Sequence, residues 1–313
     1  MSPPLWRWPA GGAELDVYGV GQISLDRLWL VDAAAPAESV PPELPTFCGG
    51  QVATALLALA RLGLRTAWTG ALGDDAAANA ALAPLLAAGV DCSDARRIHG
   101  AATRRALVCV ERSSGERTVH PERDPRVRLE PAELALTHIA GARALLVDAE
   151  DIPASRAAAE AAHAAGVPVV LDADCHREGL DALLARSDFP IVSRPLADFL
   201  GGGSARRGLQ VLAARARCAA VVTLGEAGAI AARRGCNDVI ASPAFAVAAR
   251  DTTGAGDAFH AGFMLALIAG ADLEETLRTA NAVAALNCEA LGAQGGLPDR
   301  TRLEHFLAEH PAG

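Results

Sequence analysis

The run Asp251-Thr-Thr-Gly-Ala-Gly-Asp-Ala-Phe-His-Ala-Gly-Phe263 places a small-residue turn before an apolar stretch that predicts a buried helix. Gly254, Ala255 and Gly256 can present backbone N–H groups where larger side chains would stand. A helix start concentrates unpaired N–H donors and the positive end of the helix dipole, so this turn suits an anion. Asp257 would repel a bound phosphate, which indicates a general base for an attacking hydroxyl. The alternative is that the glycines only form a tight turn and Asp257 caps the helix.

The basic residues narrow the kind of phosphate chemistry. The 313-residue chain contains no lysine, so all 28 of its basic residues are arginine. This excludes a Walker-type P-loop, whose lysine reaches the β- and γ-phosphates, and catalysis through a lysine Schiff base. Phosphate chemistry here must therefore use backbone N–H groups, arginine and metal ions.

Charge, cysteine spacing and hydropathy exclude several classes of protein. The formal net charge of −9 argues against nucleic acid or an anionic membrane as a partner. The 7 cysteines are widely spaced, which predicts reduced thiols rather than a disulfide framework or a zinc site. The first residues lack the apolar core of a signal peptide, and no apolar run approaches the ~20 residues of a membrane span. We therefore expect a cytoplasmic protein.

Strand-like and helix-like segments alternate along most of the chain. The expected strands are residues 16–23, 65–71, 144–147, 167–172 and 220–224, and the expected helices are 54–62, 76–88, 154–165 and 209–216. This alternation predicts βαβ units and a mostly parallel sheet with helices on both faces.

Two segments, residues 28–47 and 99–125, interrupt the alternation. The first carries several prolines, and the second contains two strand-like stretches joined by a turn at 113–115. We expect them to form a small antiparallel flap over a core made of residues 13–27, 48–98 and 126–309. The arginine excess between Arg96 and Arg128 either forms a solvated surface or faces an anionic group of the substrate.

From about Asp16 to about Leu307, the sequence resembles the ribokinase-like (PfkB) carbohydrate kinase family, whose C-terminal signature has the form of the 251–263 run. The resemblance implies a three-layer α/β/α sandwich with a β-sheet lid, ATP and Mg²⁺ as cofactors, and phosphoryl transfer to a sugar hydroxyl. Segments 259–262, 283–288 and 292–296 look most like the ketohexokinase-like and sulfofructose-kinase-like branch. A ketose or an anionic sugar derivative is therefore the favoured acceptor.

Several residues match positions that contact the sugar in this family. Asp26 follows the first strand, and its carboxylate can accept bonds from two sugar hydroxyls. Arg105, on the expected inner face of the flap, suits an anionic acceptor. The remaining matches are Gly49, Gly50, Thr54, where the family commonly has Asn, and Glu150. A turn aspartate and an exposed loop glutamate are the alternatives for Asp26 and Glu150.

Other matches concern the nucleotide and metal ions. The nucleotide-side residues implied by the resemblance are Thr223, Gly225, Gly228 and Asn281. Asp251, the Thr253 carbonyl and the loop 289–296 match the region that holds a monovalent cation, so K⁺ is a further candidate. The family's Asn-x-x-Glu, associated with Mg²⁺, is replaced here by Ser193 and Leu196, and Asp198 is a weak substitute.

Two other functions stay open. A nucleoside kinase of the same fold is one, although aromatic residues that could stack on a base are scarce. The other is a sugar- or nucleotide-binding regulator that has lost catalysis, for which the altered Asn-x-x-Glu is the support. Strands at the edge of the flap would be able to pair with a second subunit, giving a homodimer.

Overall fold

The computed structural model describes residues 5–6, 13–32, 44–112 and 117–311. An eight-stranded sheet in the order β14-β13-β12-β11-β10-β9-β1-β4 forms its centre. Neighbouring strands are parallel except at one edge, where β13 and β14 are antiparallel to their neighbours. The strands are β1 (Leu15–Val20), β4 (Thr66–Thr69), β9 (Ala142–Asp148), β10 (Val169–Ala173), β11 (Phe189–Ser193), β12 (Ala219–Thr223), β13 (Ala229–Arg233) and β14 (Ile240–Ser242).

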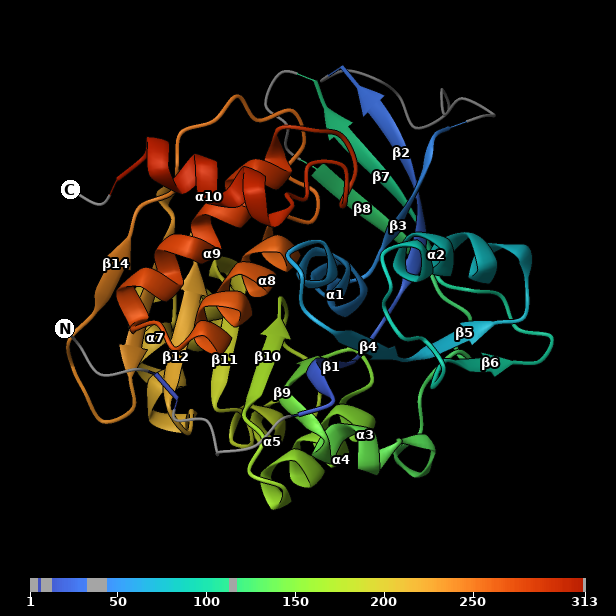
Figure 1. Cartoon of the computed structure of the whole chain (residues 1–313), viewed down its shortest axis with the longest axis horizontal. Helices are drawn as coiled ribbons and strands as arrows, with labels where there is room; N and C mark the ends of the chain where they lie inside the picture. The colour runs from blue at the N-terminus through green and yellow to red at the C-terminus, as the bar shows by residue number, and fades with distance from the viewer. Residues whose placement is uncertain (1–4, 7–12, 33–43, 113–116, 312–313) are drawn as a thin grey trace.

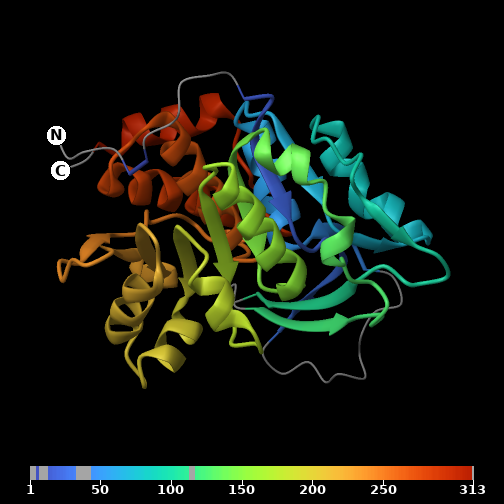
Figure 2. The same ribbon diagram turned by 90° about the horizontal axis from the view of Figure 1, so that it is seen from below.

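Helices cover both faces of this sheet, which confirms the expected α/β/α sandwich (Figures 1 and 2). One face packs against α1 (Gln51–Arg61), α8 (Ala255–Ala269), α9 (Leu273–Cys288) and α10 (Arg300–Glu309). The other packs against α3 (Leu136–Ala140), α4 (Ile152–Ala164), α5 (Leu180–Leu184), α6 (Arg194–Leu200) and α7 (Ala205–Arg215). Alternate side chains of each strand enter the two cores, since Leu146 packs on the first face and Leu145 on the second. Short β5 (Ala71–Gly73) and β6 (Arg96–Ile98), with α2 (Ala76–Ala87), extend the β4 edge.

A second, four-stranded sheet forms the lid, in the order β3-β2-β7-β8. Its strands are β2 (Ser24–Val31), β3 (Thr46–Gly49), β7 (Arg105–Glu111) and β8 (Arg117–Glu122), and they lie together beside α1 in Figure 1. The prediction of an antiparallel flap is wrong in one respect, because β2 and β7 pair in parallel. The chain passes through the core between these two strands and returns to the lid in the same direction, which a hairpin cannot do.

The boundaries of the elements also differ from those expected. The stretch 16–23 is one strand only to Val20, and β2 already belongs to the lid sheet from Ser24 onward. The turn at 113–115 and most of the proline-rich segment lie outside the described residues. Among the described residues, no helix has the length and apolar character needed to cross a membrane. Strands β3 and β8 are the lid edges, and pairing of a second subunit there stays a prediction.

Candidate functional site

A cavity of about 980 Å³ lies where the carboxyl ends of the parallel strands meet the lid and the start of α8. This is the end of an open α/β sheet at which ligands bind. Many residues chosen from the sequence line this cavity: Asp26, Gly50, Arg105, Glu150, Thr223, Gly225, Gly228, Thr253, Gly254, Ala255, Gly256, Asp257 and Asn281. The structure therefore brings segments from the whole length of the chain to one place.

The start of α8 supplies the backbone donors at this cavity. Gly254 is the residue before the helix and has φ 75°, in the left-handed region that favours glycine. A Cβ there would stand 2.3 Å from the Ala293 carbonyl oxygen, whereas a Cβ at Gly256 would meet nothing within 4 Å. No side chain of the described residues caps α8, and Gly254, Gly256 and Asp257 line the cavity, while the Ala255 N–H donates to the Thr252 carbonyl at 3.2 Å. This geometry supports the anion pocket over the alternative in which Asp257 only caps the helix.

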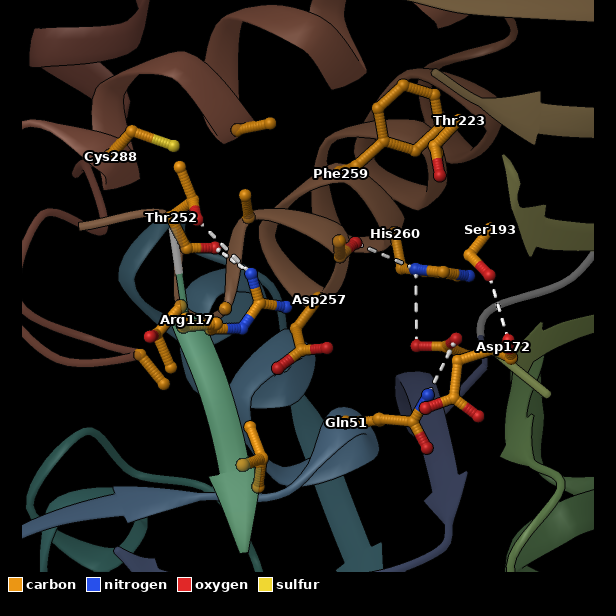
Figure 3. Close-up of a pocket in the computed structure, with 18 of the residues that line it drawn as sticks. Gln51, Arg117, Asp172, Ser193, Thr223, Thr252, Asp257, Phe259, His260 and Cys288 are labelled. Atoms are coloured by element: carbon orange, nitrogen blue, oxygen red, sulfur yellow. Dashed lines mark hydrogen bonds and ion pairs between the residues drawn. The ribbon is translucent and has the colours of Figure 1, made fainter. Parts of the chain in front are cut away.

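Asp257 lies in the first turn of α8, beside Arg117 and the Asp172–His260 pair (Figure 3). Burial raises the pKa of Asp257 to about 8, and the nearby Asp172 carboxylate adds to the rise. Arg117 of the lid lowers it less, while donating to the Thr252 carbonyl at 3.0 Å. A carboxyl whose pKa lies near neutral pH is suited to accept and release a proton.

A buried polar network lies behind Asp257. His260 Nδ1 donates to the Gly256 carbonyl at 2.8 Å and lies 3.4 Å from Asp172 Oδ2, so the proton of the ring is on Nδ1. Burial lowers the pKa of His260, which keeps the ring neutral. Burial, reinforced by Asp174 and Asp148, raises the pKa of Asp172 well above its usual range, and Gln51 donates to Asp172 at 2.9 Å.

Asp26, on β2 of the lid, also lines the cavity. Gly49 and Gly50 make room for it and for the backbone around it, since a Cβ at Gly49 would lie 2.0 Å from Asp26 Oδ2. Gly50 has φ 101°, and a Cβ there would meet the Gln22 carbonyl at 2.5 Å. Burial raises the pKa of Asp26 to about 6. Its Oδ1 is buried without a hydrogen-bond partner among the described residues, so it is able to accept a hydrogen bond from a ligand.

Glu150, which lines the same cavity, is the centre of an arginine cluster. Its side chain is 3% exposed and accepts hydrogen bonds from Arg104, Arg123 and Arg177, with Arg104 Nη1 at 2.9 Å. These guanidinium groups hold the pKa of Glu150 below its usual range, although burial alone would raise it. We call these four residues the Arg–Glu cluster. Its arginines, rather than the engaged carboxylate, are the groups available to a ligand.

Two residues predicted to contact the acceptor, Arg105 and Thr54, lie in environments that differ from the expected ones. Arg105 pairs with Asp75 at 2.8 Å and its side chain is 43% exposed, while the adjacent Arg104 turns inward. Successive residues of a strand face opposite sides, so only one of the two can point to Glu150. Thr54 does not line the cavity; it is buried in α1, and its hydroxyl accepts from Gln294 at 3.4 Å.

The four residues predicted to contact the nucleotide also line the cavity. Gly228 has φ 85°, and a Cβ there would stand 2.1 Å from the Ser242 carbonyl. Asn281 donates to the Ser242 and Pro243 carbonyls, both at 3.1 Å, and so fixes the segment that leads to Phe245. Thr223, at the end of β12, donates to the Val192 carbonyl at 3.4 Å.

The metal predictions have mixed support. Ser193 donates to the Asp174 carbonyl at 2.9 Å, Leu196 is buried, and Asp198 pairs with Arg194 at 3.6 Å. None of these three supplies a carboxylate to the cavity, but Asp174 does. Among the described residues, no group of three His, Cys, Asp or Glu side chains is positioned to hold a metal by itself.

The region expected to bind a monovalent cation is densely hydrogen-bonded. The Asp251 carboxylate is fully buried and accepts from the backbone N–H groups of Thr253 and Gly292, both at 2.8 Å. The Thr253 carbonyl accepts from Asn287 Nδ2 at 3.2 Å. These contacts engage oxygen atoms at which the sequence predicts a monovalent cation.

Several residues of the cavity wall were not singled out from the sequence: Gln22, Gln51, Arg104, Arg123, Asp172, Asp174 and Arg177. Asp172 ends an expected strand and Asp174 follows it, much as Asp148 and Glu150 follow another, so the same carboxyl-end rule would have indicated them. The arginines carry no such signal, because they lie in loops among many other arginines.

Comparison with known proteins agrees with this geometry. The pfkB family carbohydrate kinase model matches residues 20–300. The chain is 29% identical to a ribokinase from Haemophilus influenzae (84% of this chain, 87% of the relative) and 33% identical to a fructokinase from Klebsiella pneumoniae (83% and 91%). An Arabidopsis thaliana ribokinase solved with ribose and ATP superimposes with a TM-score of 0.78 at 25% identity, covering 94% of this chain and 98% of that one.

Proposed function

Because the chain belongs to the pfkB family of carbohydrate kinases, and is itself a carbohydrate kinase with the ribokinase-like fold, we propose that it transfers the γ-phosphoryl group of ATP to a hydroxyl of a ketose or an anionic sugar derivative. The single observation that carries the proposal is the position of Asp257 beside the open N-terminus of α8, inside a cavity that Asp26 also lines. A base and an anion site within one cavity are what in-line transfer to a hydroxyl requires.

In this proposal Asp257 takes the proton of the acceptor hydroxyl as the oxygen attacks the γ-phosphorus. The new O–P bond forms while the bond to the β-phosphate oxygen breaks, so the products are a sugar phosphate and ADP. The backbone N–H groups of Gly254 and Gly256 would stabilise the charge on the transferring group. Asp26 would accept hydrogen bonds from other hydroxyls of the sugar and so orient it.

Mg²⁺ fits the donor set of this cavity. The ion usually keeps several waters and binds through one or two carboxylates plus substrate phosphates, so a dedicated protein cage is not needed. Asp174 offers an exposed carboxylate at the end of β10. When bound, Mg²⁺ would neutralise charge on the ATP phosphates. The loss of Asn-x-x-Glu is thus compatible with a metal-dependent kinase.

The Arg–Glu cluster favours an anionic acceptor. Arg104, Arg123 and Arg177 all line the cavity, and these three guanidinium groups pair with two carboxylates, Glu150 and Asp151, which leaves an excess of positive charge. Arg177 Nε is buried without a hydrogen-bond partner among the described residues. A carboxylate, phosphate or sulfonate on the sugar would accept from such donors, and planar guanidinium groups bind these anions well.

A nucleoside acceptor has less support. Among the described residues, Phe245 and Phe259 are the Phe, Tyr or Trp side chains that line the cavity, and Phe245 packs edge-on against Phe306 and His310. The match of the pfkB carbohydrate kinase model over residues 20–300 weighs against a regulator without catalysis.

The test is ADP release with Mg²⁺ and ATP across ketoses, aldoses, sugar acids, sugar phosphates, sulfo-sugars and nucleosides. The proposal predicts the highest kcat/KM for a ketose or an anionic sugar. Preference for a nucleoside would support the first alternative. Binding of ATP and of a sugar without turnover for any acceptor would support the regulator.

A further inference from the structure

Asn287, near the end of α9, joins the two loops behind the anion pocket. The residue is fully buried, and its Nδ2 donates to the carbonyl oxygens of Thr253 at 3.2 Å and of Ala293 at 2.9 Å. Thr253 precedes Gly254, whose backbone approaches the Ala293 carbonyl so closely that no Cβ would fit. One amide group therefore connects the turn that carries the N–H donors to the loop 289–296.

These loops are the ones in which a monovalent cation was expected. Such a cation needs oxygen atoms of carbonyl and carboxylate groups as ligands. Here the Thr253 and Ala293 carbonyls already accept from the amide, and both Asp251 carboxylate oxygens accept backbone N–H groups. All four of these oxygen atoms already accept from protein donors, and Thr253 Oγ1 is a buried hydroxyl oxygen without a partner among the described residues, so the carbonyl and carboxylate set does not form a free ligand shell for the ion.

The orientation of the Asn287 side chain carries this argument. The oxygen and nitrogen of an amide are told apart by their hydrogen-bond partners. Turning the amide over would place Oδ1 against the Thr253 and Ala293 carbonyl oxygens, with no hydrogen between the three atoms. Only a cation would stabilise that cluster. In the observed orientation Oδ1 has no partner among the described residues, but both carbonyls are satisfied.

We propose that the Asn287 amide replaces a monovalent cation in this chain and holds the anion pocket in its binding geometry without K⁺. The link to nucleotide affinity rests on the proposed kinase function. Asn287 is a positioning residue, since it acts on the phosphate through the turn at Gly254.

The wild-type protein gives the first test. The dissociation constant of ADP, from calorimetry, and the Tm without nucleotide are measured in KCl and in tetramethylammonium chloride at equal ionic strength. We expect equal Tm values and ADP affinities within about twofold, against the ~5–150-fold changes typical of a coupled effector. A rise of about fivefold or more in ADP affinity with K⁺, or a K⁺-dependent rise in Tm, would overturn the proposal. The Tm needs no nucleotide, so this arm stands even if the kinase assignment fails.

The second test uses Asn287→Ser, which removes both Nδ2 bonds and leaves space beside the Thr253 and Ala293 carbonyl oxygens. We expect ADP affinity to fall by about tenfold in tetramethylammonium chloride and to recover at least partly in KCl. The matched control is Asn281→Ser, which removes two amide–carbonyl bonds on the same helix and should show the same affinity in both salts. An equal loss in both salts for a folded Asn287→Ser protein would contradict the replacement of a cation by the amide.

Discussion

The two ends of the cavity are built from different parts of the chain. At the proposed phosphate end, one run, residues 253–257, lines the cavity with the glycine turn and the start of α8. At the acceptor end the lining groups are side chains from separate loops, namely Arg104, Arg123, Glu150 and Arg177. A backbone site can therefore be recognised in one short motif, whereas a side-chain site depends on how the sheet gathers distant segments.

The largest effect expected is on Asp257, the one catalytic side chain proposed for the phosphate end. Asp257→Asn keeps the shape of the side chain but cannot take a proton. A positioned base contributes ~10²–10⁴-fold, so kcat should fall by at least ~10²-fold while the KM for ATP stays within a few-fold. Steady-state kinetics with the best acceptor measure both constants. Normal turnover in a correctly folded variant would refute the role of Asp257.

Gly254→Ala tests whether the proposed phosphate end depends on the backbone conformation at Gly254. The added Cβ would meet the Ala293 carbonyl oxygen at 2.3 Å, at a residue with φ 75°. We expect the free energy of unfolding to fall by about 2 kcal/mol or more, together with a loss of ADP affinity. Urea unfolding and calorimetry measure these two quantities.

Gly256→Ala is the matched control for stability. A Cβ at Gly256 would have nothing within 4 Å, and the residue lies inside α8. The free energy of unfolding should stay the same or rise by up to about 1 kcal/mol. Equal destabilisation by both substitutions would show that the close approach to Ala293 is not what requires glycine at 254.

The sequence was sufficient for the elements whose pattern is local. Short apolar strands alternating with helices predicted the layers, and the 251–263 run predicted the glycine turn before α8. The parallel pairing of β2 and β7 was missed, because it joins segments separated by most of the N-terminal part of the core. No local pattern carries that information, since strand direction depends on the path between the two strands.

The residues of the candidate site, like the elements of the fold, were predictable where the signal is local. Glycines with a required conformation, such as Gly50, Gly228 and Gly254, lie where the motifs indicated. The choice between Arg104 and Arg105 was not predictable, because it depends on which face of β7 points to Glu150. The involvement of Gln51 with Asp172 likewise arises only when α1 is placed beside β10.

The acceptor end is tested by Arg177→Gln, which removes a guanidinium whose Nε has no protein partner among the described residues. For an anionic acceptor, KM should rise by about tenfold or more, since a hydrogen bond to a charged group contributes about 1.5–3 kcal/mol. The KM for ATP should stay the same. Acceptor titrations at saturating ATP measure the change.

Arg126→Gln is the control for this substitution. Arg126 pairs with Asp124 at 2.7 Å, its side chain is 59% exposed, and it does not line the cavity. The KM of the Arg126→Gln protein for the acceptor should equal that of the wild type. If the best acceptor is neutral and Arg177→Gln leaves its KM unchanged, the anionic-sugar proposal is wrong.

A smaller effect is expected in the pH dependence of turnover. Burial and Asp172 raise the pKa of Asp257 to about 8, and a base works only when deprotonated. Turnover should therefore rise with pH up to about 8 rather than level off above pH 4. Asp172→Asn removes the neighbouring carboxylate, lowers the pKa of Asp257 and should move this rise to lower pH. A wild-type profile that is flat from pH 5 to 9 would contradict this environment for Asp257.

The smallest effect concerns stability without ligands. The folded-state pKa of Asp257 lies above its usual 3.8, so the protonated carboxyl favours the folded protein. That contribution is complete below about pH 4 and is lost as pH rises towards 8. Asp257→Asn keeps a neutral side chain at every pH, so its Tm advantage over the wild type should grow across this range. Thermal scans at several pH values test the sign of the change.

Phosphoryl transfer itself tests the central claim most directly. ³¹P NMR of the wild-type protein with ATP, Mg²⁺ and the acceptor chosen by the screen follows substrate and products in one sample. The account predicts that a new sugar-phosphate resonance grows in step with ADP, one sugar phosphate for each ADP formed. Asp257→Asn should lower the rate of its growth by at least ~10²-fold. ADP formation without a phosphorylated acceptor, or binding of both substrates without any new resonance, would contradict it.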